Sequence, residues 1–250
     1  HDKSLQVREL GTDELCSIID QVADLRCLTI RFTGGEPLLR KDFEEIYRYT
    51  RNQGIRVLLS TNARLITPQI AELFANLIPG KPIVVSVYGM SARSYDQVAL
   101  EKGAYDEFWS GIELLKKHNI PFTVIQSVLP PNKKEQNLYE DFANGLEFQG
   151  GKPVYTMNYD LRVRRDSEKL NDRIKSLRLS PDETVAMLAK KPEQYKAEMQ
   201  EFAGQFLSLH GDELFRCGAG SGVCIDAYGN ALMCSLLRHP DTIVSLTNQG

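Results

Sequence analysis

The run CLTIRFTGGEPLLRKDFEEI, residues 27–46, decides the fold of this 250-residue chain. Its first part is a short apolar segment of the kind that forms a buried β-strand. The pair Gly34-Gly35 then allows a tight turn, and the residues after it begin a helical pattern. The run therefore predicts strand, glycine turn and helix, which is the repeating unit of a parallel sheet.

The same unit recurs along the first 160 residues. The spacing of apolar residues predicts helices over 12–25, 41–53, 67–78, 104–118 and 133–148, and further strands over 55–60, 82–88, 120–129 and 153–159. Alternation of this kind implies parallel strands with right-handed crossovers, in an open doubly wound sheet or in a full or partial barrel. In either fold, functional groups gather where the strands end.

The composition excludes several classes of protein. The chain is 42% hydrophobic and 25% charged, which is enough apolar material for a core. Its five cysteines are too few for a disulfide-stapled module, and no apolar run approaches the roughly 18 residues of a membrane span. The net charge of −3 gives no general attraction to nucleic acid or to anionic membranes. We therefore expect a cytoplasmic protein with no nucleic-acid or membrane partner.

The region after residue 160 has a different pattern. The charged segment 161–178 is interpreted as a solvated connector, with a mobile basic segment that touches an acidic substrate or peptide as the alternative. Ser180, Pro181 and Glu183 together predict a capped helix start, and a second helix is expected over 192–208. Residues 222–234 read as a β-hairpin around Gly229.

The strand ends carry small and polar residues that suit a ligand. Thr33 to Pro37, Ser60 with Asn62, and Ser86 with Tyr88 follow successive strands, and Gln126 lies near the end of the next. Two glycines at a strand end let backbone groups approach a ligand closely. Tyr88 is interpreted as a pocket wall or, as a weak catalytic candidate, a residue that contacts substrate or takes part in radical or proton steps.

In its full context, GGEPLLRKDFEEI with STN and VSVYG at the next two strand ends resembles the radical S-adenosylmethionine (SAM) family over about residues 10–160. The resemblance implies that Gly34, Gly35, Glu36 and Pro37 hold the amino group of SAM. It also implies that Ser60, Asn62 and Ser86 lie near the ribose or the carboxylate. The implied fold is α/β: a partial (β/α)6 TIM-like barrel, without its first strand in these 250 residues.

Three of the cysteines crowd into one window near the end of the sequence. Cys217, Gly229 and Cys234 have the spacing C-x11-G-x4-C, which looks like the start of a SPASM domain. The resemblance implies that Cys217 and Cys234 ligate an auxiliary [4Fe–4S] cluster; a partial zinc site or unligated thiols are the alternatives. Cys224 is interpreted as a core residue, a substitute ligand or a redox-active thiol, and the first is favoured. Cys16 and Cys27 are expected in the core.

The sequence departs from the family pattern in two places. The triplet C-x3-C-x2-C that ligates the radical SAM [4Fe–4S] cluster is not in the chain, and neither are the later SPASM cysteines. The chain begins with His1 rather than Met and stops at Gly250, so we expect a fragment or an ordered part of a longer protein. The expected domains are a barrel over 1–165, a helical linker over 166–211 and the SPASM start over 212–250.

The resemblance implies an enzyme that reductively cleaves SAM, with an external electron donor of the flavodoxin or ferredoxin type, and abstracts a hydrogen atom from its substrate. The function favoured here is maturation of a ribosomally made peptide with a leader, by thioether or carbon–carbon crosslinking, epimerisation or a similar change. The alternatives are an anaerobic sulfatase-maturating or small-molecule radical SAM enzyme and, in a different class, a cluster-free SAM- or peptide-binding pseudoenzyme.

Overall fold

The computed structural model describes residues 9–150, 153–157, 168–206, 222–234 and 240–246 of the chain. The chain divides into two compact units. One unit is Thr12–Leu179, and the other joins His1–Gly11 to Ser180–Gly250. The larger sheet belongs to the first unit and the smaller sheet to the second.

Five parallel strands form the sheet of the first unit within the described residues, in the order β1-β2-β3-β4-β5. The strands are β1 (Thr29–Phe32), β2 (Arg56–Thr61), β3 (Ile83–Val87), β4 (Phe122–Val128) and β5 (Val154–Met157). Strands that are neighbours in the sequence are also neighbours in the sheet, as expected for successive β–α units. The predicted α/β partial barrel is confirmed.

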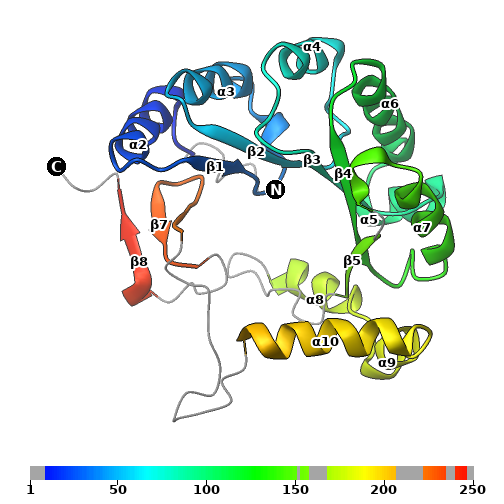
Figure 1. Ribbon diagram of the computed structural model, residues 1–250. Coiled ribbons are helices and arrows are strands. Elements are labelled where there is room, and N and C mark those ends of the chain that lie inside the picture. The colour runs from blue at the N-terminus through cyan, green and yellow to red at the C-terminus, as the bar shows by residue number, and fades with distance from the viewer. Residues whose placement is uncertain (1–8, 151–152, 158–167, 207–221, 235–239, 247–250) are drawn as a thin grey trace. The chain divides into compact units, whose positions relative to one another are not determined.

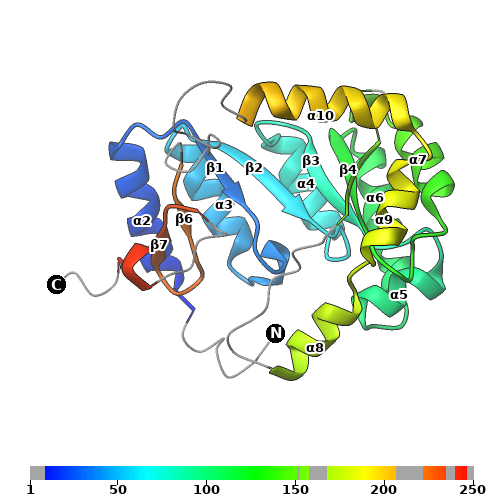
Figure 2. The same cartoon turned by 90° about the horizontal axis from the view of Figure 1, so that it is seen from below.

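Helices cover one side of this sheet, and Figure 1 shows α2, α3, α4 and α6 along the outside of the curved row of strands. The view in Figure 2 shows β1 to β4 side by side, with α3, α4 and α6 beyond them. The helices of the unit are α2 (Thr12–Asp24), α3 (Phe43–Asn52), α4 (Pro68–Asn76), α5 (Ala92–Ala99), α6 (Ala104–Lys117), α7 (Gln136–Asn144) and α8 (Glu168–Ser176). Short 3₁₀ turns cover Pro37–Leu39 and Glu147–Gln149.

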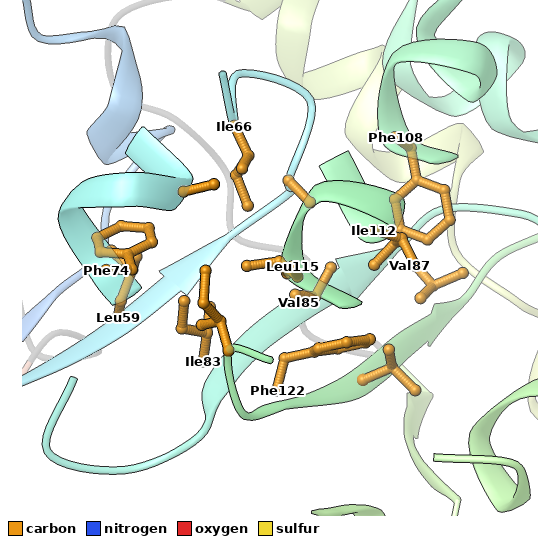
Figure 3. Packing of buried hydrophobic residues seen from close by; sticks show 14 of the residues in the cluster. Leu59, Ile66, Phe74, Ile83, Val85, Val87, Phe108, Ile112, Leu115 and Phe122 are labelled. Carbon is orange, nitrogen blue, oxygen red and sulfur yellow. The ribbon is translucent and has the colours of Figure 1, made fainter. Parts of the chain in front are cut away.

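The core lies between the sheet and these helices. Alternate residues of the strands are buried, for example Val57 and Leu59 of β2 and Ile83 and Val85 of β3. The residues between them are more exposed and face the opposite side of the sheet, because strand side chains alternate. Figure 3 shows the buried side chains of this cluster, with Phe74 among them. The helix side of the sheet therefore holds the core, and most side chains on the opposite, inner side of β2 and β3 are partly exposed.

Most predicted elements are confirmed within two or three residues, and three details differ. Helix α5 was not predicted, and it is only eight residues long; Ser91 caps it by accepting a hydrogen bond from the Ser94 amide. Helix α8 lies in the charged segment that we interpreted as a connector. Cys27 is exposed rather than buried, and Cys16 is only partly buried, so neither is a true core thiol.

The second unit contains helices α9 (Pro181–Leu188) and α10 (Pro192–Phe206), and a small antiparallel sheet of β6 (Cys224–Ile225), β7 (Asn230–Leu232) and β8 (Ile243–Ser245). A 3₁₀ turn covers Pro240–Thr242. The predicted capping box at Ser180 and the hairpin around Gly229 are confirmed. Gly229 has a φ of +79°, which is why the turn needs glycine. Strand β8, which pairs with β7, was not predicted.

No helix in the described part of the chain has both the length and the apolar character that crossing a membrane requires.

One close approach fixes helix α6 against the loop after β2. An added Cβ at Gly111 would lie 2.0 Å from the carbonyl oxygen of Ala63, a residue whose φ is +64°. We expect Gly111→Ala to lower the free energy of unfolding by about 2 kcal/mol, because overpacking outweighs the better helix propensity of alanine. Urea unfolding followed by circular dichroism measures this change.

Gly204→Ala in α10 is the matched control, because nothing lies within 4 Å of its added Cβ. That variant should be neutral or slightly stabilising. Equal stability of the Gly111→Ala variant and the unaltered protein would show that the contact with Ala63 does not constrain the loop.

Candidate functional site

The candidate site begins at the turn that follows β1. Gly34 has a φ of +125°, a conformation that only glycine adopts readily, and nothing lies within 4 Å of its missing Cβ. Glu36 then starts the 3₁₀ turn Pro37–Leu39, and its side chain accepts a hydrogen bond from the Leu38 amide at 3.2 Å. The turn therefore exposes the backbone of Gly34 and Gly35, and the carboxylate of Glu36 follows directly after these glycines.

The Glu36 carboxylate connects this turn to the end of the neighbouring strand. Its Oε1 also accepts a hydrogen bond from the Thr61 hydroxyl at 2.7 Å, and its Oε2 accepts one from the Asn62 amide at 2.7 Å. A carboxylate has about four acceptor positions. Among the described residues, groups of the protein occupy three of these positions, which leaves capacity on Oε2 for one more donor. The remaining position suits an ammonium group.

The loop after β2 is shaped by its own side chains. The Asn62 Oδ1 accepts a hydrogen bond from the Arg64 amide at 3.0 Å, and the Thr61 hydroxyl accepts one from the Ala63 amide at 3.1 Å. Arg64 then donates to Glu101 at 2.6 Å and to Glu107 at 2.8 Å. These bonds hold the loop rigidly, so Asn62 reaches the site in a defined position.

Tyr88 brings the end of β3 to the same place. Burial raises the pKa of its hydroxyl first of all, and the nearby charge of Glu36 raises it further. Arg64 and a hydrogen bond with the Asn62 side chain act in the opposite direction. The Tyr88 ring packs against Tyr95 with centroids 5.4 Å apart. Tyr88 is therefore a neutral phenol at neutral pH, held beside Glu36 and Asn62.

Ser60 and Ser86 lie on the inner side of the sheet, opposite the core, and both are partly exposed. In the parallel register Ser60 pairs with Val84 and Thr61 pairs with Val85. The residues that follow these pairs, Asn62 and Ser86, are therefore neighbours at the ends of β2 and β3. The structure thus gathers Glu36, Asn62 and Tyr88 through their interactions, with Ser60 and Ser86 on the adjoining inner face.

Gln126 is not part of this group. It is fully buried on the helix side of β4, where its Oε1 accepts a hydrogen bond from Gln136 at 2.7 Å. The register pairs it with Val87, another residue of the core face. We expected Gln126 to lie with the ligand-facing residues at the strand ends. This was wrong, because consecutive residues of a strand face opposite sides of the sheet and Gln126 faces the helices. Ser127 is the residue of this strand end that faces inward.

Sequence reasoning missed two residues, Asn132 and Glu135, that connect the loops at the ends of β3 and β4. Asn132 is fully buried, donates to the carbonyl oxygens of Tyr88 and Ser127 at 2.8 and 2.9 Å, and accepts from the Leu129 amide. Glu135 accepts hydrogen bonds from the Met90 amide and from two serine hydroxyls at the start of α5. Only their position after a strand end distinguishes them in the sequence.

The cysteines are only partly described. Cys217 lies outside the described residues, whereas Cys224 and Cys234 are partly exposed hairpin residues that form no disulfide within the described part of the chain. Cys224 pairs with Leu232 across the hairpin, and Cys234 follows two residues later. Within the described ranges, no three His, Cys, Asp or Glu side chains are grouped to hold a metal ion. The described residues alone therefore do not hold an iron–sulfur cluster.

Comparisons with known proteins place this geometry in context. The profile of the Radical SAM superfamily matches residues 3–144. The AdoMet-dependent heme synthase of Methanosarcina barkeri is 37% identical over 132 residues, which are 53% of this chain and 38% of that protein. The mycofactocin maturase MftC of Mycobacterium tuberculosis is 27% identical over 241 residues, which are 92% of this chain and 58% of that protein.

A solved structure titled "Native anSMEcpe with bound AdoMet and Kp18Cys peptide" has a similar fold. The TM-score is 0.61 at 15% sequence identity, and the match covers 94% of this chain and 69% of that one. The chain thus spans only part of the length of these relatives. The profile match includes the GGEP turn and the strand ends that Glu36 connects, and it extends over more than half of the sequence. The chain belongs to the radical SAM superfamily of enzymes.

Proposed function

We propose that this chain is the SAM-binding part of a radical SAM enzyme that modifies a peptide. The observation that carries the proposal is the arrangement around Glu36, where a carboxylate with one unfilled acceptor position lies under an open glycine turn. An ammonium group with three donors suits that carboxylate and the free backbone carbonyls of Gly34 and Gly35. The amino group of SAM has this chemistry.

The remaining site residues fit the other parts of SAM. Ser60, Ser86 and Asn62 offer hydroxyl and amide groups for a ribose or a carboxylate at the inner rim. Tyr88, as a protonated phenol beside Asn62, serves as a wall of the pocket and as a hydrogen-bond donor. In this arrangement Pro37 fixes the exit of the turn because its φ is restricted.

The radical chemistry comes from the cofactors. A [4Fe–4S] cluster held by the whole protein would supply the electron for cleavage of SAM, whereas this chain's own residues would bind and orient SAM and exclude water around it. The ligand triplet of that cluster is not in the 250 residues, and we propose that it belongs to the whole protein. An external flavodoxin- or ferredoxin-type donor would supply the electron.

Two relatives suggest different substrates. The match to mycofactocin maturase MftC extends over 92% of this chain, and so continues past the sheet unit into the hairpin unit. This extent favours a peptide substrate with a leader, and an auxiliary cluster of the SPASM kind with Cys217 and Cys234 as ligands. The match to heme synthase has higher identity but covers 53% of the chain. A small-molecule substrate is therefore the second candidate.

The enzyme hypothesis is tested on the full-length protein after anaerobic reconstitution with iron and sulfide. We expect iron–sulfur absorbance, and 5′-deoxyadenosine when SAM and a strong reductant are added. Formation of neither would favour a cluster-free binding protein. A gene for a short Cys-rich peptide beside this gene, and a mass change of that peptide after incubation with the enzyme, would favour a peptide maturase over a small-molecule enzyme.

Glu36 is the sharpest test of the SAM site. We expect Glu36→Ala to weaken SAM binding at least about tenfold, because it removes a charge-assisted hydrogen bond. The free energy of unfolding should fall as well, by about 1–3 kcal/mol, since the Asn62 amide and the Thr61 hydroxyl lose their acceptor. Isothermal titration with SAM and urea unfolding measure the two effects.

Thr61→Val is the control for this structural contribution. It removes the hydrogen bond between the Thr61 hydroxyl and Glu36 but leaves the carboxylate in place. This variant should lose stability and keep SAM affinity within a few-fold of the unaltered protein. A folded Glu36→Ala variant with unchanged SAM affinity would remove Glu36 from the binding site.

The auxiliary cluster is tested by the iron content. We expect Cys234→Ala to lower the iron of the reconstituted full-length protein by about one cluster, because a thiolate ligand is lost. Cys27→Ala is the control, since that thiol is exposed on the other unit. Iron content that is the same in both variants would show that Cys234 is an unligated thiol.

A further inference from the structure

The inner side of the five-stranded sheet has an unusual chemical character. Its inward positions on the described strands carry hydroxyl, aliphatic and arginine side chains, and no aspartate or glutamate. The hydroxyls include Ser60, Ser86, Thr123, Ser127 and Thr156. A surface with many hydrogen-bond donors, a positive charge and no carboxylate attracts an anionic group.

Arg31 is the charged residue of this face that lies nearest the GGEP turn. Its neighbours Ile30 and Phe32 pack into the core on the helix side, so Arg31 faces the inner side and is exposed. Its Nη1 donates to the Ser60 hydroxyl at 3.2 Å. Because Arg31 is paired with Leu58 in the register, contact with Ser60 means that the guanidinium leans toward the strand ends.

The guanidinium of Arg31 is unusual among the arginines near the site. Arg40 pairs with Asp42 at 2.7 Å, and Arg64 pairs with Glu101 and Glu107. Within the described residues, Arg31 has the Ser60 hydroxyl as its hydrogen-bond partner and pairs with no carboxylate. A guanidinium has five N–H donors, arranged to bind a carboxylate through two parallel bonds. Most of these donors remain available.

We propose that Arg31 and Ser60 form a carboxylate-binding subsite on the inner face of the barrel. The inference rests on the proposed function, which brings two carboxylates to this face: that of SAM and an acidic group of the substrate. Within the described residues Glu36 bonds to Leu38, Thr61 and Asn62 and not to Arg31, so the guanidinium is not taken up by this carboxylate. Arg31 would therefore decide whether an acidic ligand is accepted.

The test compares Arg31→Gln with Arg56→Gln in the full-length protein. Arg56 is a matched control, since it is an exposed arginine on the same face at the opposite end of the neighbouring strand. Isothermal titration measures SAM affinity. Ligand-observed NMR measures binding of two capped tripeptides, acetyl-Gly-Glu-Gly-amide and its glutamine counterpart. Arg31→Lys is the third variant, because lysine keeps the positive charge but cannot donate two parallel hydrogen bonds to a carboxylate.

We expect Arg31→Gln to weaken binding of a carboxylate ligand about 10- to 100-fold, with a smaller loss for Arg31→Lys and none for Arg56→Gln. A loss confined to SAM assigns the subsite to SAM. A loss confined to the glutamate peptide, with the glutamine peptide unaffected, assigns it to the substrate. Unchanged binding of both ligands overturns the inference. Failure of the unaltered protein to bind SAM would instead count against the proposed function.

Discussion

The candidate site depends on one carboxylate. Glu36 accepts hydrogen bonds from its own turn and from the end of the next strand, and so joins two segments that are separated by a whole helix. A buried or half-buried carboxylate is stable only when such donors surround it. The glycine turn, the loop of Asn62 and the phenol of Tyr88 all take their positions from this junction. Ligand binding and local stability are therefore linked at Glu36.

A second set of hydrogen bonds and ion pairs holds the loops that follow β2, β3 and β4. Asn132 and Glu135 hold the loops after β3 and β4, and Arg64 holds the loop after β2 through two glutamates. The buried Asn132 amide uses both its donor and its acceptor atom, and the Glu135 carboxylate accepts three hydrogen bonds, which favours a single conformation of these loops. The rim is thus preorganised before any ligand arrives, and the inner face offers its hydroxyls and Arg31 without rearrangement.

The two units suggest a division of roles in the proposed enzyme. The sheet unit carries every residue that we assign to SAM, whereas the hairpin unit carries Cys224 and Cys234. Family membership rests on the first unit, because the profile match ends at residue 144. The choice between a peptide and a smaller substrate rests on the second, because the match to the Mycobacterium tuberculosis maturase extends into it, whereas the match to the heme synthase covers 53% of the chain.

The sequence by itself determined the order of the five parallel strands and of most helices, the hairpin and the GGEP turn, because apolar periodicity and glycine act locally. It also indicated Ser60, Asn62, Ser86 and Tyr88 through their places at strand ends. Only the tertiary structure decided that Gln126 faces the core, that Cys27 is exposed and that Glu36 bridges two strands. The side that a strand residue faces and the partner of a carboxylate depend on register and on distant segments, which no local pattern records.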